Sequence, residues 1–379
     1  MEIVETSCKA KLGGISRMSV CTFVLIALMS VIFIPSQKAA ACTAITLNAK
    51  DGSTIQARTQ EWGAFNLDSD LMVIPRGTHI QSNTPDSKPG IKWKSKYGAL
   101  GINGMHLPMC IDGMNEKGLS ISVLYLPGMA KFEPYKPAQA HRSINAIDLP
   151  MWFLTKFATV DEIKEELPKI KVVGVPLKEL GGIPAPVHWL ITDQTGKTIV
   201  IEYTDEKMHI YDNPVGVLTN SPEFPWHLTN LSNYVGLQPK PRSSEKIGEL
   251  EVSPLGAGSG LAGLPGDFTP VSRFIRATAF RNTVRPLQTG DDAAQEAFRI
   301  LNNFDIPLGA VASPAKDLIG STQITTAMDT KALRYYYHTQ YNSRLRVVDL
   351  KNIDFSKGNI RYKPMDKEKK QDYEIISVE

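Results

Sequence analysis

Residues Cys42–Gly63, CTAITLNAKDGSTIQARTQEWG, combine the pattern of a β-hairpin with a cysteine at its first position. Apolar residues alternate with others on both sides of the pair Asp51-Gly52. An Asp-Gly pair between two alternating runs is typical of a tight hairpin turn. We therefore predict two antiparallel strands, in which Arg58 on the second strand passes back beside Cys42.

The segment before Cys42 has the features of an export signal. Basic residues precede an apolar run over residues 18–34, and Ala39–Ala41 place small residues where a signal peptidase cuts. We predict that residues 1–41 are a signal peptide and that the mature chain begins at Cys42, in the periplasm or outside the cell. The apolar run is also long enough for an uncleaved anchor, the one arrangement in which we expect membrane contact.

The rest of the chain mixes groups of strands with groups of helices. Three β-rich runs lie between Val187 and Tyr211, and helical spacing occurs at 146–157, 160–170 and 291–304. Strands that are grouped together predict an α+β protein of stacked layers rather than a strict βαβ alternation. We interpret the polar, proline-containing stretches Asn83–Gly90 and Leu237–Lys246 as surface loops, and residues 42–379 as a single domain.

Composition and charge exclude several classes of function. A formal net charge of +3 over 379 residues gives no indication of a nucleic-acid partner, so none is expected. The seven histidines form none of the usual zinc motifs, so we expect no metal ion. His188 and His227, each next to a tryptophan, are interpreted as buried or hydrogen-bonded structural residues.

Of the four cysteines, only Cys42 and Cys110 follow the predicted cleavage site. They offer one disulfide, but cleavage before Cys42 also creates a thiol and a free α-amine on a single residue. An α-amine has a pKa of about 7.7–8.0, so it can accept a proton near neutral pH. A guanidinium beside the thiol favours the thiolate, and Arg58 is the residue expected to supply it. Cys42 is therefore a candidate nucleophile with its own base.

A different class of function also fits the same cysteine. Small residues flank Cys42 as they flank the lipidated cysteine of a surface lipoprotein, in which case the remaining chain would be a binding domain. The sequence AAAC lacks the leucine that usually stands three residues before a lipidated cysteine. This hypothesis is therefore kept as the alternative.

Five ordered blocks of the chain carry a resemblance to a known family: CTAITLNAKDGSTIQARTQEW, DGMNEKGLSISVLYLPG, HWLITDQTGKTIVIE, GVLTNSPEFPWHLTNLSNYVGL and GLPGDFTPVSRFIR. The chain resembles the choloylglycine hydrolase and penicillin V acylase family of N-terminal nucleophile hydrolases. The resemblance covers nearly all of the mature chain. It implies an αββα sandwich, two stacked antiparallel sheets between helical layers. Members commonly form tetramers, so a homotetramer is expected.

The resemblance also implies roles for particular residues. Cys42 stands where the family has its nucleophile, and Arg58 where it has the arginine beside the thiol. Asn220 matches the asparagine that supports the oxyanion, and Arg273 matches the second active-site arginine. Glu61 is a departure, because many members have aspartate there to hold the α-amine. Its side chain keeps the charge but is longer by one methylene.

Substrate preference is expected to depend on Tyr125, where bile salt hydrolases tend to have asparagine and penicillin V acylases tyrosine. Trp62 is a candidate for the same acyl pocket. The resemblance thus implies an exported amidase that cleaves small N-acyl amides through an acyl-thioester on Cys42, without a cofactor. Exported members from Gram-negative bacteria are also associated with acyl-homoserine lactone cleavage, which is the alternative activity within the family.

Overall fold

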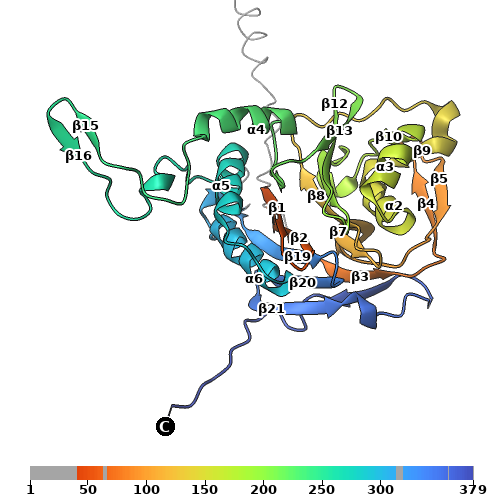
Figure 1. Cartoon of the computed structure of the whole chain (residues 1–379). Helices are drawn as coiled ribbons and strands as arrows, with labels where there is room; N and C mark the ends of the chain where they lie inside the picture. The colour runs from red at the N-terminus through yellow and green to blue at the C-terminus, as the bar shows by residue number, and fades with distance from the viewer. Residues whose placement is uncertain (1–40, 63–65, 313–318, 357, 379) are drawn as a thin grey trace, which may run out of the picture. The chain divides into compact units, whose positions relative to one another are not determined.

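The computed structural model describes residues 41–62, 66–312, 319–356 and 358–378 (Figure 1). By internal contacts the chain divides into residues 1–37 and 38–379, and all of the described residues belong to the second unit. The predicted signal segment, apart from Ala41, lies outside the described residues. Among the residues that are described, no helix is long and apolar enough to cross a membrane.

The predicted hairpin at the start of the mature chain is confirmed. It consists of β1 (Cys42–Asn48) and β2 (Thr54–Glu61), paired antiparallel with Ala44 opposite Arg58. Gly52 in the turn has a φ of +87°, a left-handed conformation that glycine adopts without the steric cost of a Cβ. This register brings Arg58 back to the beginning of β1.

The hairpin belongs to a six-stranded antiparallel sheet of the described chain, which we call sheet one. Its strands follow the order β14 (Val217–Leu218), β1, β2, β19 (Thr322–Asp329), β20 (Arg334–Thr339) and β21 (Asn342–Asp349). The pairing of β2 with β19 at the centre of the sheet therefore joins the first strands of the mature chain to strands that lie far away in the sequence.

A second antiparallel sheet, sheet two, has eight strands within the described residues. Their order is β13 (Lys207–Asp212), β12 (Thr198–Thr204), β11 (Val187–Thr192), β8 (Ser120–Tyr125), β7 (Leu107–Asn115), β6 (Ala99–Gly104), β3 (Asp70–Ile74) and β22 (Arg361–Pro364). The three predicted β-rich runs between Val187 and Tyr211 correspond to β11, β12 and β13, which confirms that prediction.

Helices cover the outer faces of both sheets, which gives the αββα sandwich that the resemblance implied (Figure 1). On sheet one lie α5 (Pro270–Thr283) and α6 (Gly290–Leu301), and on sheet two lie α2 (Leu149–Lys156) and α3 (Val160–Glu166). The helical patterns predicted at 146–157, 160–170 and 291–304 are confirmed as α2, α3 and α6 with their flanking 3₁₀ turns. The sequence did not predict α5.

Burial in β2 follows from its place in the sandwich. Every residue of this strand is buried, because one face packs on α6 and the other on sheet two. The face toward sheet two is partly polar and contains Arg58, which is only 1% exposed. Nearby, the buried carboxylate of Asp112 accepts hydrogen bonds from Ser122, Thr326 and Tyr335. The two sheets are thus joined by polar contacts as well as apolar packing.

The remaining elements are short. The paired strands are β4 (His79–Asn83) with β5 (Pro89–Lys94), β9 (Ser143–Asn145) with β10 (Lys171–Val173), β15 (Glu245–Ile247) with β16 (Leu250–Val252), and β17 (Val311–Ala312) with β18 (Ile319–Gly320). The other elements are α4 (Phe224–Asn230), η1 (Pro137–Arg142), η2 (Ala146–Asp148), η3 (Leu167–Lys169), η4 (Lys178–Leu180), η5 (Leu231–Tyr234), η6 (Ser259–Leu261), η7 (Asn302–Phe304) and η8 (Leu350–Asn352).

The two predicted surface loops need small corrections. The stretch Asn83–Gly90 contains the turn between β4 and β5, but Asn83 ends β4 and Pro89 and Gly90 begin β5, with Asn83 paired to Pro89 across the turn. The stretch Leu237–Lys246 is a loop up to Ser244, and its last residues begin β15.

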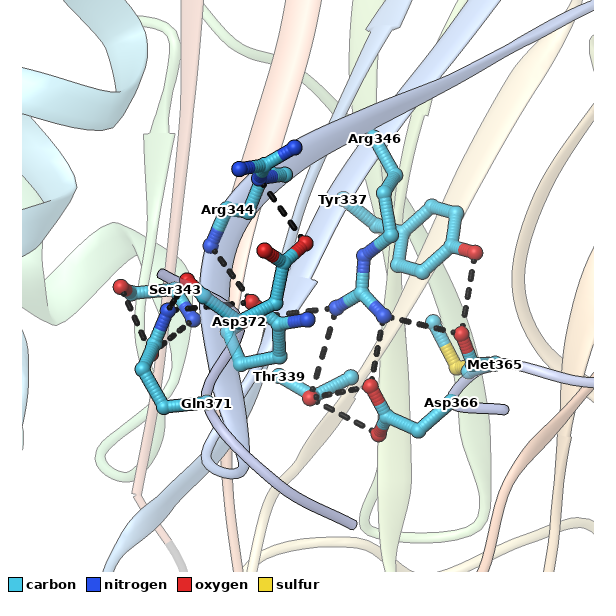
Figure 2. A network of polar contacts seen from close by, with 10 residues as sticks. Tyr337, Thr339, Ser343, Arg344, Arg346, Met365, Asp366, Gln371 and Asp372 are labelled. Carbon is cyan, nitrogen blue, oxygen red and sulfur yellow. Dashed lines mark hydrogen bonds and ion pairs between the residues drawn. The ribbon is translucent and has the colours of Figure 1, made fainter. Parts of the chain in front are cut away.

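After β22 the chain returns to the edge of sheet one, where polar side chains hold it (Figure 2). The guanidinium of Arg346 on β21 donates to both the carboxylate of Asp366 and the carbonyl of Met365. It also lies over the ring of Tyr337, 4.6 Å from the ring centroid. Residues 365–366 are therefore tied to β20 and β21, the last two strands at one edge of sheet one.

Candidate active site

The candidate site is built around Cys42, the first residue of β1. Its side chain is only 5% exposed, and its Sγ accepts a hydrogen bond from Nη2 of Arg58 at 3.0 Å. The Arg58 guanidinium is held in turn by backbone carbonyls, because Nε donates to Thr59 at 3.1 Å and Nη1 donates to Val123 of sheet two. Arg58 is thus fixed by both sheets with one N–H directed at the thiol.

Burial and charge act in opposite directions on the thiol. Burial raises the pKa of Cys42 and outweighs the neighbouring guanidinium of Arg58, which acts to lower it. The prediction that Arg58 favours the thiolate therefore describes only one of two effects. Because the thiol keeps its proton near neutral pH, nucleophilic attack requires a base close to Sγ.

Glu61, at the end of β2, is a buried carboxylate on the same side of the site. Its backbone N–H donates to the carbonyl of Ala41 at 3.0 Å, and its Oε1 accepts from the hydroxyl of Thr322 at 3.1 Å. Its Oε2 is buried and has no hydrogen-bond partner among the described residues. Burial raises the pKa of Glu61 to about 7, against the opposing charge of Arg273.

Asn220, which follows β14, joins three parts of the site through its side-chain amide. Its Oδ1 accepts from the backbone N–H of Cys42 at 3.0 Å and from Nη2 of Arg273 at 2.5 Å. Because both partners can only donate, this atom must be the oxygen. Its Nδ2 donates to the carbonyl of Tyr125 at 2.7 Å. One N–H of the amide therefore orients the side chain, and the second has no hydrogen-bond partner among the described residues.

Arg273 lies in the first turn of α5 and is completely buried. Its guanidinium donates to the backbone carbonyl of Cys42 and, at 3.0 Å, to the hydroxyl of Thr43. Burial lowers the pKa of Arg273, while the charge of Glu61 acts to raise it. Arg273 thus connects α5 to the start of β1 and carries positive charge into the site.

Trp62 and Tyr125, the two residues predicted for an acyl pocket, are in contact. Their ring centroids are 5.3 Å apart and the rings meet edge to face at 88°. Tyr125 ends β8, and its carbonyl holds Asn220 as described above. Each of the seven predicted site residues therefore interacts with at least one other through a hydrogen bond, a ring contact or its charge: Cys42, Arg58, Glu61, Trp62, Tyr125, Asn220 and Arg273. Their catalytic and binding roles stay predictions.

Cys110 does not belong to the site, and the disulfide hypothesis is wrong for this structure. Both Cys42 and Cys110 are free and buried. The thiol of Cys110 contacts the carbonyl of Asp112 on its own strand at 3.2 Å. Burial raises the pKa of Cys110 to about 12, so its thiol is inert near neutral pH. Within the described chain, no group of three or more His, Cys, Asp and Glu side chains is placed to hold a metal ion.

Thr322 is a contact that sequence reasoning missed. It lies opposite Glu61 because β19 pairs with β2, and its hydroxyl is what holds the carboxylate. No local motif marks this threonine, since the pairing joins segments at opposite ends of the chain. Only knowledge of the sheet order could have identified it.

A cysteine that begins the first strand of an αββα sandwich, beside a buried arginine and an oriented asparagine, defines an N-terminal nucleophile hydrolase. Comparison with known proteins identifies the group within this class. The family model for linear amide C-N hydrolases of the choloylglycine hydrolase family matches residues 42–362. The chain belongs to the choloylglycine hydrolase family and is an amide-cleaving hydrolase.

Individual relatives agree with this assignment. A bile salt hydrolase/transferase from Clostridium perfringens is 35% identical over 318 residues, which are 83% of this chain and 94% of the relative. The crystal structure of a conjugated bile acid hydrolase from the same species matches with a TM-score of 0.77 at 32% identity, over 89% of this chain and 100% of that one. Penicillin V acylase from Agrobacterium tumefaciens matches with a TM-score of 0.68 at 25% identity, over 83% and 88% of the two chains.

Proposed function

We propose that the protein is an exported cysteine amidase that hydrolyses the linear amide bond of small N-acyl compounds, with Cys42 as the nucleophile. The observation that carries this proposal is the 3.0 Å contact between Nη2 of Arg58 and Sγ of Cys42 at the first position of β1. In this arrangement cleavage after Ala41 leaves an α-amine and a thiol on one residue. The high pKa of the buried thiol makes such a base necessary.

The reaction follows from the groups around Sγ. The α-amine takes the thiol proton, and the thiolate attacks the amide carbon while Arg58 stabilises its charge. The second Nδ2–H of Asn220 donates to the oxygen of the tetrahedral intermediate. Tyr125, whose carbonyl binds the first Nδ2–H, lies beside this donor. One such donor typically contributes about 10²- to 10³-fold to kcat.

The intermediate then collapses and the acyl group is released. The ammonium returns the proton to the leaving nitrogen, the C–N bond breaks, and an acyl-thioester forms on Cys42. The amine next takes a proton from water and the resulting hydroxide attacks the thioester. The C–S bond then breaks, the acyl group leaves as a carboxylic acid, and the ammonium returns its proton to the Cys42 thiolate. The unpartnered Oε2 of Glu61 supports a role in holding the α-amine, since an amine has N–H groups to donate and this oxygen accepts none from the described residues.

For the substrate, we propose an aryl-acyl amide such as penicillin V rather than a conjugated bile salt. The support is the pair of Trp62 and Tyr125, whose nearly perpendicular rings form an aromatic surface, together with the hydrogen bond from Nδ2 of Asn220 to the Tyr125 carbonyl. Acyl-homoserine lactones contain the same kind of bond and are the alternative substrate class. We further propose that the signal segment is removed and that the mature protein is located in the periplasm or the medium. We also propose that it forms a homotetramer, whose mass light scattering would measure.

A panel assay with two matched cysteine variants tests the proposal. Wild type, Cys42→Ser and Cys110→Ser are compared on penicillin V, on glycine- and taurine-conjugated bile acids, and on acyl-homoserine lactones. We expect hydrolysis by wild type and Cys110→Ser and almost none by Cys42→Ser. Full activity of Cys42→Ser would refute the nucleophile.

Intact-mass measurement of the exported protein separates the amidase from the lipoprotein alternative. A chain that begins with unmodified Cys42 supports the amidase, because the α-amine and the thiol are then both free. A diacylated cysteine adds a large apolar mass and supports the lipidated binding protein instead.

A further inference from the structure

Two buried histidines hold the backbone on which Asn220 is carried. The ring Nε2 of His188 lies 3.0 Å from the carbonyl oxygen of Thr219, and that of His227 lies 2.9 Å from the carbonyl oxygen of Asn220 itself. Among the described residues, neither histidine forms a hydrogen bond with Cys42, Arg58, Glu61 or Arg273, and His227 binds only the backbone carbonyl of Asn220. Their contacts are instead with two consecutive peptide groups next to the proposed oxyanion donor.

The geometry fixes the protonation of His227. A carbonyl oxygen only accepts, so the proton must be on Nε2. Its Nδ1 is buried and has no hydrogen-bond partner among the described residues, which suits an unprotonated nitrogen. Burial lowers the pKa of His227 to about 4, so the ring is neutral near neutral pH. The ring also stacks on Phe274, with centroids 4.6 Å apart and planes 15° apart.

This stacking links the histidine to the other side of the site. Phe274 follows Arg273 on α5, and Arg273 donates to Oδ1 of Asn220. His227 is therefore packed against the helix that orients the side chain of Asn220 while it binds the backbone of the same residue. The position of Asn220 relative to α5 is therefore set at its backbone by His227 and at its side chain by Arg273.

His188 adds a second support through Glu202. Both side chains are completely buried, and Nδ1 of His188 lies 2.8 Å from Oε1 of Glu202. The Glu202 carboxylate also accepts from the backbone N–H of Phe224 at 3.1–3.2 Å, at the start of α4. Glu202 thus anchors His188, and through it Thr219, to the segment that follows Asn220.

We propose that His227, supported by the His188–Glu202 pair, is a positioning residue that holds the peptide of Asn220 so that its free Nδ2–H meets the oxyanion. The inference rests on the proposed amidase function. If the donor is misplaced, the transition state loses stabilisation that the bound substrate does not feel. The loss should therefore fall on kcat rather than on KM.

A matched pair of variants tests this role. His227→Gln keeps an N–H donor close to the position of Nε2, whereas His227→Met fills a similar volume without a donor. On the best substrate of the panel we expect His227→Met to lower kcat by about 10- to 100-fold with KM little changed, as for a misplaced catalytic group. We expect His227→Gln to recover most of that loss. Equal kcat values for wild type and His227→Met, or equal losses in the two variants, would overturn the role.

A double-mutant cycle shows whether His227 acts through Asn220. In an Asn220→Ala background the donor is already gone, so His227→Met should lower kcat no further. Losses that multiply would mean that His227 acts independently, against the proposal. If His227→Met does not fold, His227→Asn, whose shorter amide does not reach the Nε2 position, replaces it in both comparisons.

The same assay distinguishes failure of this inference from failure of the proposed function. If Cys42→Ser hydrolyses the substrate as fast as wild type, the amidase mechanism and the positioning role both fall. If Cys42→Ser is inactive while His227→Met retains wild-type kcat, only the positioning role is wrong.

Discussion

At Cys42, two electrostatic effects act on the pKa of the thiol in opposite directions. Removal from water favours the neutral thiol, and the Arg58 guanidinium at 3.0 Å favours the thiolate. The net effect is a raised pKa, so Arg58 is better understood as a partner for the charge that develops during attack than as a group that ionises the resting thiol. The α-amine of the mature chain then has a defined task.

Replacing Arg58 should make this balance visible. In Arg58→Met the opposing effect is lost, so the pKa of Cys42 should rise further and its thiolate should form only at higher pH. The pH dependence of alkylation by iodoacetamide measures this directly, with Arg58→Met compared with Arg58 in a Cys110→Ser background so that Cys42 is the only described thiol that reacts. Arg58→Lys, which keeps a positive charge, is the control. A profile that stays in place in Arg58→Met would show that Arg58 has no electrostatic role.

Tyr125 offers a second prediction at the scale of one residue. Its ring packs edge-on against Trp62, so Tyr125→Asn should open the aromatic wall and shift preference toward bulkier acyl groups. We expect the ratio of kcat/KM for penicillin V to that for a conjugated bile salt to fall by about 10- to 200-fold. Tyr125→Phe keeps the ring and should keep the ratio. An unchanged ratio in Tyr125→Asn would assign specificity to loops elsewhere.

Local elements were predictable where their signals were local. The hairpin of β1 and β2 was predicted from alternation and an Asp-Gly turn, and this alone brings Arg58 beside Cys42. The α6 helix was predicted from its acidic first turn and apolar spacing. By contrast, α5 has no strong apolar stripe, since its buried face includes Ser272, Arg273 and Arg276. The helix that carries a proposed site residue is therefore the one that periodicity missed.

The N-caps of α5 and α6 allow a matched test of this element. Thr269 caps α5 by accepting from Ser272 N, and Thr289 caps α6 in a capping box. Each threonine-to-alanine change should cost about 1 kcal/mol of unfolding free energy in urea denaturation. Only Thr269→Ala should also lower kcat, by roughly 3- to 10-fold. The reason is that Arg273 directly follows Ser272, the residue whose N–H the Thr269 side chain binds. Equal kcat values in the two variants would show that the cap of α5 does not position Arg273.

The carboxylate before α2 should make stability depend on pH. Burial raises the pKa of Asp148 to about 6, and Ser82 donates to it at 2.7 Å. The pKa of Asp148 in the folded protein lies above its ordinary value, so the protonated carboxyl group stabilises the fold relative to the ionised one. This stabilisation is complete below about pH 4 and is lost as pH rises through 6. Asp148→Asn should therefore raise the unfolding free energy at pH 8, by about 3 kcal/mol, with little gain at pH 4. A gain of the same size at both pH values would contradict a buried ionised carboxylate.

At the scale of the whole molecule, the site depends on contacts that no local pattern contains. Asn220 meets Cys42 because β14 pairs with β1, and Glu61 meets Thr322 because β19 pairs with β2. The resemblance to a family carried Asn220 and Arg273 into the prediction, whereas residue patterns alone led only to Cys42 and Arg58. Sheet order is set by packing of the entire sandwich, so its consequences for the site had to be seen in the structure.

The last prediction concerns the state of the chain before Cys42. In the described structure Ala41 precedes Cys42, its carbonyl is bound by the N–H of Glu61, and the backbone N of Cys42 donates to Asn220. As an amide this nitrogen has no basic lone pair, so a chain that keeps residues 1–41 should fold and yet hydrolyse at least about 10²-fold more slowly than a chain beginning at Cys42, the lower range for loss of a general base. N-terminal sequencing identifies the two forms, and kcat is then measured on each. The rate of Cys42→Ser is subtracted as the rate without the nucleophile. Equal rates for the two forms would mean that some other residue acts as the base, and Glu61, with its pKa of about 7, would be the first to replace.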